Sequence, residues 1–381
     1  MPLPLDGVRV LDLTRLLPGG LCTMMLADLG ADVVKIEDPN GGDYARWMPP
    51  LVDGQSVFFR INNRRKRSLI LDLKQPDGVA VLKRLAAQAD VLVEGFRPDV
   101  MARLGCDYAV LAALNPRLVY GSLSGWGADG PYALRGGHDL NYEAVAGLIG
   151  AMGTPQPPGG QAADMGGAYA AIAGILAALL QRERTGRGQF VDVSLFEAAL
   201  PLVMYSWVEA VTTGTGGGTG GLTGGAACYQ VYPAQDGRSV ALAALEPKFW
   251  ANFCAAVERP DLLSDYLLPE RQPYLKAELA EIFALKTAAE WAALLTPADC
   301  CFSLVNPPNA VHTDPQVQAR GLLGIGADGA PWMRSPLRFG VDAPLGSVPG
   351  YGQHTREVLR EAGFTADEIA VLEQQGVTRQ G

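Results

Sequence analysis

The sequence predicts an α/β protein with a large Rossmann-like parallel-sheet domain and a smaller α+β domain. Over the first two hundred residues, short apolar segments alternate with helical ones, which is the pattern of βαβ units. A glycine-rich stretch at 213–225 interrupts this alternation. Beyond it, a hairpin pattern precedes several helices, which indicates a different packing. A length of 381 residues suits about two domains.

The large domain is expected to contain six strands joined mainly by helices. The strands are the apolar segments at 8–13, 32–37, 69–73, 91–94, 118–123 and 190–193. Helices are expected after the Pro18-Gly19-Gly20 turn, over 77–88 and 166–182, and from residue 195. Because strands that are joined by helices run parallel, this order predicts a parallel sheet covered by helices.

The second half of the chain begins with a predicted hairpin. Residues 229–232 and 239–245 flank an Asp236-Gly237 turn, and helices are expected at 248–257, 274–284 and 288–295. The tail is expected to be helical over 354–362, with a capping box of Thr365 and Glu368 opening the last helix. These patterns predict a large domain over 1–200, a glycine-rich linker over 201–227 and a small α+β domain over 228–329.

Composition restricts the possible partners. A net charge of −9 argues against nucleic acid, which needs a basic surface. No continuous apolar run reaches the roughly 18 residues that span a bilayer, and the N-terminus has no secretory pattern, so we expect no membrane partner. The six cysteines lack metal-ligand spacing and fit reduced thiols in a cytoplasm. Five cations within 60–67 are either a solvated charge run or an anion site.

Several familiar motifs are absent. The first strand–turn–helix reads Leu17-Pro18-Gly19-Gly20 and lacks the G-x-G-x-x-G pattern, which argues against NAD. The sequence has no P-loop motif, and residues 121–125 have leucine where a nucleophile elbow needs serine. With three histidines and no histidine pair at helical spacing, no metal site is predicted.

Three residues are candidates for chemistry. His138 stands at a glycine turn before an apolar helix, Asp164 stands ahead of a helix of small residues, and Glu246 follows the second hairpin strand. Each also has a purely structural interpretation: His138 can cap or pack, Asp164 can be an N-cap, and Glu246 can be a first-turn acid before a proline.

Together these groups suit proton transfer at the carbon next to a thioester carbonyl. Inverting that centre needs a base on one face and an acid on the other. A neutral imidazole can serve one face, and a carboxyl group whose pKa is raised by burial can serve the other. Glu246 can orient His138, and the amides of residues 165–167 can donate to the enolate oxygen.

The chain resembles the family III CoA-transferase superfamily and, within it, the α-methylacyl-CoA racemases. The resemblance covers nearly the whole chain and is carried by the segments 5–13, 26–34, 71–74, 94–98, 124–127 and 185–189, together with Asp192. The racemase patterns Gly-His-Asp-x-Asn-Tyr and Glu-Pro-x-Phe are present at 137–142 and 246–249. The resemblance implies racemisation of 2-methylacyl-CoA thioesters, with His138 and Asp164 as acid–base groups and Glu246 supporting His138.

It also implies an interlocked homodimer whose large domain is completed by residues 330–381. No cofactor is implied beyond the coenzyme A of the substrate. The coenzyme A contacts that it implies are arginines, namely Arg64, Arg65, Arg67 and Arg97. Where racemases commonly have arginine after the second strand, this chain has Glu37-Asp38-Pro39, and Arg46 is expected to compensate.

Two alternatives remain open at this point. In the transferases of the superfamily, the aspartate that matches Asp164 is a nucleophile that carries coenzyme A between carboxylates. The glycine-rich stretch, and Ala226-Ala227-Cys228 in place of a racemase-like Ala-Pro-Tyr, keep that activity possible. The other alternative is a protein that binds coenzyme A without catalysis.

Overall fold

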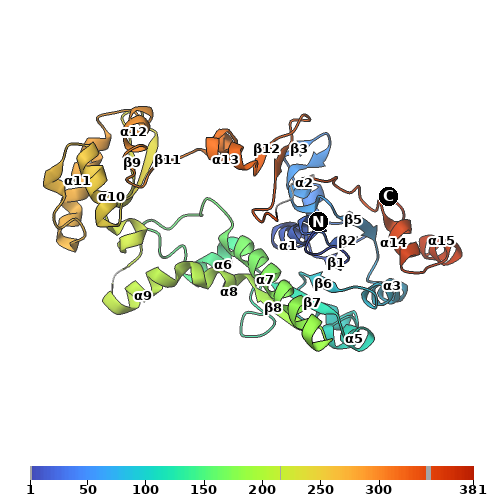
Figure 1. The fold of residues 1–381 in the computed structure, drawn as a ribbon. Coiled ribbons are helices and arrows are strands. Elements are labelled where there is room, and N and C mark those ends of the chain that lie inside the picture. Colours follow the sequence, from blue (N-terminus) through green and yellow to red (C-terminus); the bar gives the residue numbers. More distant parts are fainter. Residues whose placement is uncertain (1, 215, 340–344) are drawn as a thin grey trace. The chain divides into compact units, whose positions relative to one another are not determined.

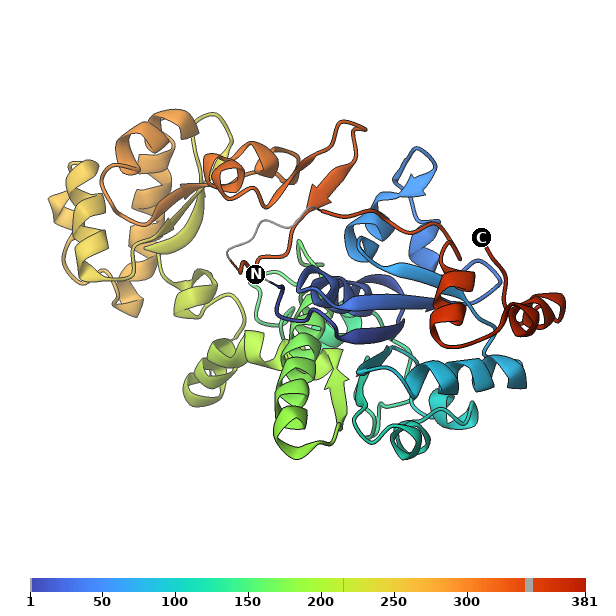
Figure 2. The ribbon, with the colours of Figure 1, turned by 45° about the vertical axis from the view of Figure 1, so that its right-hand side comes forward.

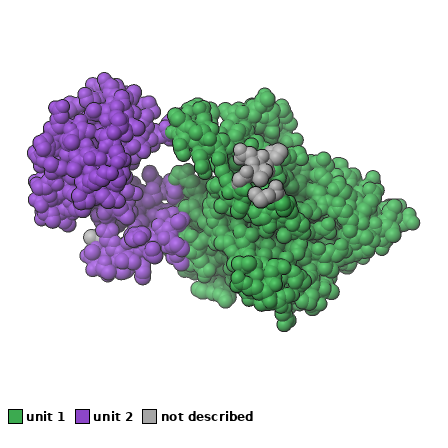
Figure 3. Space-filling view, in the orientation of Figure 1, with its two compact units in different colours: residues 1–146, 159–199, 312–381 green, residues 147–158, 200–311 purple. Residues whose placement is uncertain are grey.

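The computed structural model describes residues 2–214, 216–339 and 345–381. The chain divides into two compact units, which Figure 3 colours separately. Unit 1 comprises residues 1–146, 159–199 and 312–381, and unit 2 comprises residues 147–158 and 200–311.

Unit 1 is built on a six-stranded parallel sheet (Figure 1). Its strands are β1 (Arg9–Leu13), β2 (Asp32–Glu37), β5 (Arg67–Ile70), β6 (Val91–Glu94), β7 (Val119–Ser124) and β8 (Phe190–Ser194). Their order is β5-β2-β1-β6-β7-β8. The three strands that come first along the chain, β1, β2 and β5, therefore form one half of the sheet, and β6, β7 and β8 form the other half. This is the doubly wound Rossmann order, and it confirms the predicted fold class.

Helices cover both faces of this sheet (Figure 2). Adjacent residues of a strand point to opposite faces, and accordingly Val10 packs in one apolar core while Leu11 packs in the other. The Val10 side is covered by α1 (Leu16–Asp28) and α7 (Ala162–Thr185). The other side is covered by α3 (Pro76–Ala86), α5 (Tyr108–Leu114), α14 (Thr355–Glu361) and α15 (Ala366–Gln374).

The remaining elements of unit 1 are short. They are β3 (Leu51–Val52), β4 (Gln55–Ser56), α2 (Val57–Asn63), α4 (Val100–Arg103), α6 (Asp139–Ala146), α8 (Leu195–Ala199), α13 (Pro315–Arg320), β12 (Leu323–Ile325) and β13 (Pro331–Met333). The last helix, α15, opens with the predicted capping box of Thr365 and Glu368.

Unit 2 contains an antiparallel sheet in the order β11-β10-β9. Its elements are α9 (Met204–Thr213), β9 (Tyr229–Pro233), β10 (Ser239–Ala243), α10 (Pro247–Ala256), α11 (Gln272–Phe283), α12 (Ala288–Leu295) and β11 (Phe302–Leu304). The expected hairpin is β9–β10, in which Ser239 pairs with Pro233 and Ala243 with Tyr229. Its core is rich in stacked aromatic rings, such as Trp250 on Tyr266 at 5.1 Å between centroids.

The two units divide the chain differently from the predicted domains. Residues 200–227 belong to unit 2 and include the helix α9, where a linker was expected over 201–227. The chain returns to unit 1 at residue 312, whereas the predicted return was at 330. Residues 147–158 also group with unit 2, and no local sequence pattern indicates that grouping.

By length and apolar composition alone, two helical stretches, 162–185 and 195–213, are long enough to cross a membrane. The first is α7, whose buried alanines and isoleucines pack against the sheet of unit 1, as a core helix does. The expectation of no membrane partner stays a prediction.

Candidate functional site

A cavity of about 210 Å³ opens at the carboxyl edge of the parallel sheet in unit 1. It is lined by the segments that follow β1 and β6, by the end of β7 and the glycine after it, and by the starts of α1, α6, α7 and α8. The residues are Thr14, Arg15, Leu16, Pro18, Gly19, Gly95, Leu123, Gly125, Gly137, His138, Tyr142, Asp164 and Leu195. β1 and β6 are the two strands between which the strand order reverses. Ligands of doubly wound sheets bind outside the carboxyl ends of the strands at this point.

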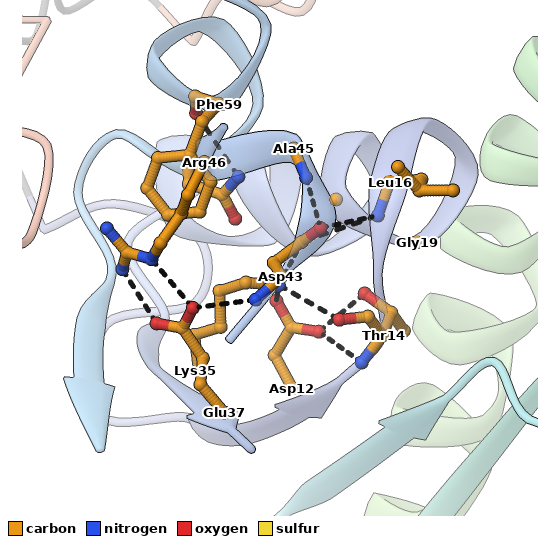
Figure 4. A network of polar contacts seen from close by, with 12 residues as sticks. Asp12, Thr14, Leu16, Gly19, Lys35, Glu37, Asp43, Ala45, Arg46 and Phe59 are labelled. Atoms are coloured by element: carbon orange, nitrogen blue, oxygen red, sulfur yellow. Dashed lines mark hydrogen bonds and ion pairs between the residues drawn. The ribbon is translucent and has the colours of Figure 1, made fainter. Parts of the chain in front are cut away.

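A buried polar network fixes the cavity rim after β1 (Figure 4). Asp12 is 0% exposed and accepts hydrogen bonds from the amide and hydroxyl of Thr14 at 2.9 and 2.6 Å. Asp43 accepts from the amide of Leu16 at 3.1 Å, and Lys35 Nζ lies 2.9 Å from Asp43. Burial favours a raised pKa for Asp12, but the charge of Lys35 and several hydrogen bonds hold that pKa below its usual range. The network therefore holds Thr14 and Leu16 in place.

The turn before α6 is held by the ring of Tyr142. The Tyr142 hydroxyl donates to the carbonyl of Gly137 at 2.7 Å, and the ring packs edge-on against Trp126 with 4.9 Å between centroids. A Cβ atom at Gly125 would stand 2.3 Å from the Tyr142 oxygen, and one at Gly137 would stand 2.8 Å from the ring. Both positions therefore require glycine, and the tight packing presents His138 at the cavity.

His138 immediately precedes α6, where its carbonyl accepts from the amide of Asn141 at 2.8 Å. Its own amide donates to the Asn141 side chain at 3.0 Å. The imidazole is exposed and forms no hydrogen bond with the residues that the structure describes. His138 thus bonds to this turn through its backbone amide and carbonyl, and its imidazole ring is available to a ligand.

Asp164 lines the same cavity from the first turn of α7. Its amide donates to Asp139 Oδ1 at 3.0 Å. Burial of the carboxyl group and the negative charge of Asp139 raise the pKa of Asp164 from 3.8 to about 7. A carboxyl group with a pKa near neutrality can both accept and donate a proton under ordinary conditions.

The start of α7 differs from what the sequence predicts. The helix begins at Ala162, so Asp164 is its third residue, and the N-cap position is occupied by Gln161. The amide of Met165 already donates to the carbonyl of Gln161 at 3.0 Å, so the prediction that this amide binds an enolate oxygen is wrong. The N-cap interpretation of Asp164 is also wrong.

Glu246 belongs to unit 2, where it is the N-cap residue of α10. Its side chain forms no capping hydrogen bond, and the residue is exposed. The Glu246 side chain therefore does not stabilise the start of α10 through a hydrogen bond. Its predicted support of His138 stays a prediction.

Most of the arginines predicted to contact coenzyme A are engaged with carboxylates. Arg46 pairs with Glu37 at 2.7 Å, Arg64 pairs with Asp28, and Arg67 bonds Asp32 at 2.9 Å. Arg65 lies 3.7 Å from the same Asp28. The side chain of Arg97 is exposed, and a Cβ atom at Gly136, which precedes the His138 turn, would stand 3.2 Å from its guanidinium. Among the described residues, Arg97 is the member of this set that forms no ion pair, and it lies beside the turn before His138.

Two acidic residues were missed by reasoning from the sequence alone. Asp139 and Glu143 lie four residues apart on α6, and both face the start of α7, where Glu143 Oε1 accepts from the amide of Ala162 at 2.8 Å. Their four-residue spacing in a helical segment was a usable signal, because it places two carboxyl groups on one face. In the described part of the chain, no cluster of three or more metal-binding side chains occurs.

The chain is similar to known proteins over almost all of its length. The sequence model described as CoA-transferase family III matches residues 5–355. A human alpha-methylacyl-CoA racemase is 34% identical, covering 97% of this chain and 96% of that protein. A mouse succinyl-CoA:glutarate CoA-transferase is 33% identical, covering 97% and 88% respectively. The crystal structure of a CAIB/BAIF family protein from Brucella suis has a TM-score of 0.82 at 30% identity, covering 95% of this chain and all of that one.

Proposed function

This chain belongs to CoA-transferase family III, and from that premise we propose that it racemises 2-methylacyl-CoA thioesters. The observation that carries the proposal is that His138 and Asp164 line one cavity at the strand-order reversal of the sheet. An imidazole and a carboxyl group whose pKa lies near 7 form an acid–base pair that can work in either direction.

In the proposed reaction, one of the two groups removes the proton on the carbon next to the thioester carbonyl. The electrons of that C–H bond move into the carbonyl, which becomes an enolate oxygen. The other group then donates a proton to the opposite face of the same carbon, and the carbonyl re-forms. For one enantiomer, neutral His138 is the base and protonated Asp164 the acid; for the other enantiomer the roles exchange. Each direction leaves the pair with one proton in total, so the enzyme is ready for the reverse reaction.

We place the enolate oxygen at the start of α6. The amides of Asp139 and Leu140 donate no hydrogen bond to any acceptor found among the described residues, and they directly follow His138. Unpaired amides at a helix start stabilise a developing negative charge. This assignment replaces the amides of residues 165–167, the first of which is already paired. Arg97 is proposed to meet a phosphate of the coenzyme A moiety.

The second candidate function is coenzyme A transfer between carboxylates, with Asp164 as the nucleophile. It is favoured by the comparisons, because the mouse succinyl-CoA:glutarate CoA-transferase is about as similar to this chain as the human racemase. It is disfavoured by the protonation of Asp164, since a carboxyl with a pKa of about 7 is only partly ionised, and hence only partly nucleophilic, at neutral pH.

We also propose a homodimer in the cytoplasm, in which Glu246 of the second subunit orients His138. An exposed carboxylate without a capping hydrogen bond suits that role. Sedimentation of the purified protein and the activity of mixed Glu246→Gln and His138→Ala subunits test it. A dimer with shared sites regains about a quarter of the activity in such mixtures by random pairing, whereas a site within one chain regains none.

The test of the reaction is solvent deuterium incorporation into a panel of 2-methylacyl-CoA thioesters. Racemisation predicts exchange by the wild type and its loss in His138→Ala and Asp164→Asn. His312→Ala is the matched control, because His312 does not line the cavity. Transfer predicts instead that hydroxylamine traps Asp164 after incubation with acyl-CoA, without exchange. Tight coenzyme A binding with neither reaction would show a protein that binds without catalysis, and retained exchange in both variants would remove the assignment.

A further inference from the structure

Glu143 carries a buried carboxyl group with one oxygen that lacks a hydrogen-bond partner. The residue is 0% exposed, its Oε1 accepts from the amide of Ala162 at 2.8 Å, and its Oε2 has no partner. Across the described ranges, no lysine, arginine or histidine forms an ion pair with it. An ionised carboxylate in such a place is strongly unfavourable, and the usual response is to take up a proton.

The neighbour that can use this proton is Asp139. The two residues lie four apart on α6 and therefore on one face of the helix, so Glu143 Oε2, which otherwise has no partner, can donate to Asp139 once it carries a proton. Two carboxyl groups can hydrogen-bond only if one of them carries a proton, because an ionised carboxylate is solely an acceptor. Asp139 is half-buried and uses its Oδ1 to accept from the amide of Asp164 at 3.0 Å. Glu143, the more deeply buried of the pair, is the natural holder of the proton.

We propose that Glu143 is a positioning residue: it stays protonated at neutral pH, donates its proton to Asp139, and so holds the Asp139 carboxylate against the first turn of α7. The fixed negative charge of Asp139 then makes Asp164 a weaker acid, which keeps it protonated often enough to return a proton to the substrate. Asp139 and Glu143 thus form a supporting pair behind the acid–base group. The importance of this pair for turnover rests on the proposed function, whereas the proton on Glu143 does not.

Other charged groups near the start of α7 leave this arrangement intact. The other titratable residue on α6 is Tyr142, which stands directly before Glu143 in the sequence. His138 directly precedes the helix. The segment before α1 contributes Arg15, which donates to the Tyr44 hydroxyl at 3.1 Å. Two more charged residues lie on neighbouring elements, the exposed Arg97 after β6 and the exposed Glu197 on α8. Neither arginine forms an ion pair with Asp139, Glu143 or Asp164 among the residues described.

The deciding variants are Glu143→Gln and Asp139→Asn. Glutamine copies a protonated glutamate, because its amide N–H can donate to Asp139 while its carbonyl accepts from Ala162. If Glu143 is protonated, Glu143→Gln moves the titration midpoint of Asp164 by less than about 0.5 pH unit, while Asp139→Asn lowers it by about one unit or more. Glu197→Gln, an exposed glutamate on α8, is the matched control and is expected to change neither midpoint nor activity.

Infrared titration of the free enzyme measures these quantities without substrate. The wild type minus Glu143→Gln difference spectrum at pH 7 is expected to contain the carbonyl band of a protonated carboxyl group. Difference spectra of wild type minus Asp164→Asn over a range of pH give the titration midpoint of Asp164. The same measurement is repeated with Glu143→Gln and with Asp139→Asn as the starting protein. Absence of the band, or a midpoint lowered as far by Glu143→Gln as by Asp139→Asn, would overturn the proposal, because either result means that Glu143 is ionised.

Enzyme kinetics test whether Glu143 positions Asp139. Glu143→Leu removes the hydrogen bond to Asp139 and is expected to lower kcat for α-proton exchange and to shift its pH profile, with little change in KM. An unchanged profile contradicts the positioning role; if this variant does not fold, Glu143→Gln and the infrared titration still decide. A wild type that shows the protonated band but no exchange refutes the proposed function alone, whereas exchange without the band refutes this inference alone.

Discussion

Replacing Gly125 by alanine tests how the turn that carries His138 is held. The added Cβ would stand 2.3 Å from the oxygen of Tyr142 and 2.6 Å from its Cζ atom, whereas ordinary contacts lie at 3.4–4 Å. The ring has little room to retreat, because Tyr142 is 6% exposed and packs edge-on against Trp126. The alanine must therefore displace either the ring or the backbone after β7 by roughly an ångström.

The displacement has two measurable consequences. Overpacking of a buried site costs about 1–3 kcal/mol of stability. Because the Tyr142 hydroxyl also bonds the carbonyl of Gly137 at 2.7 Å, the shift is passed to the residue before His138. Misplacing a catalytic group by about 1 Å can lower a rate by about 10²-fold, so the loss of α-proton exchange is expected to exceed the loss of folded protein.

The assays are urea denaturation and the rate of deuterium exchange on one thioester. Gly159→Ala is the matched control, since a Cβ there meets nothing within 4 Å and the backbone does not need a positive φ. We expect Gly159→Ala to behave as the wild type in both assays. Gly125→Ala with the stability and exchange rate of that control would refute the argument that Tyr142 positions the His138 turn.

Three further predictions concern a buried carboxyl group, a buried ion pair and an exposed thiol. The pKa of Asp164 is raised from 3.8 to about 7 in the folded state. The protonated carboxyl group therefore stabilises the fold fully below about pH 4, and this stabilisation is lost as the pH rises through 7. In urea titrations, the wild type is expected to lose stability between pH 4 and 7 relative to Asp164→Asn. Asp12→Ala leaves Lys35 and Lys66 buried without their shared carboxylate and is expected to cost about 3–5 kcal/mol, measured by denaturation against the exposed-pair control Arg117→Ala. Cys301 is the exposed thiol, so mass spectrometry after brief iodoacetamide treatment is expected to find it labelled before the five buried cysteines.

The sequence carried enough information for the parallel sheet because each strand is a short apolar run bounded by turn residues. The segment 91–94 coincides with β6, and 190–193 falls one residue short of the end of β8. Helix ends were less predictable. Ala162 and Ala163 belong to α7, but the glycines and the absence of a capping side chain hide its start from a local pattern. The cap is supplied from another helix, by Asp139 and Glu143, so it is a tertiary feature.

The sequence singled out His138 and Asp164 as candidates because each stands close to a pair of glycines in a local segment. That both line one cavity depends on the strand order, which brings the segments after β1, β6 and β7 to one edge of the sheet. The ion pairs of the arginines could not be predicted from the sequence, because they also depend on contacts between distant segments. Arg67 bonds Glu357 at 3.0 Å, across almost three hundred residues, and no local pattern indicates that this arginine pairs with the C-terminal segment.

The central claim is that two groups exchange protons with opposite faces of one carbon atom, and single-enantiomer turnover in deuterated water tests it most directly. Starting from pure (S)-2-methylacyl-CoA thioester, we predict that each newly formed (R) molecule carries deuterium at the inverted carbon, and that neither His138→Ala nor Asp164→Asn inverts the substrate. Inversion that retains the original hydrogen, or inversion that survives both substitutions, would contradict the account.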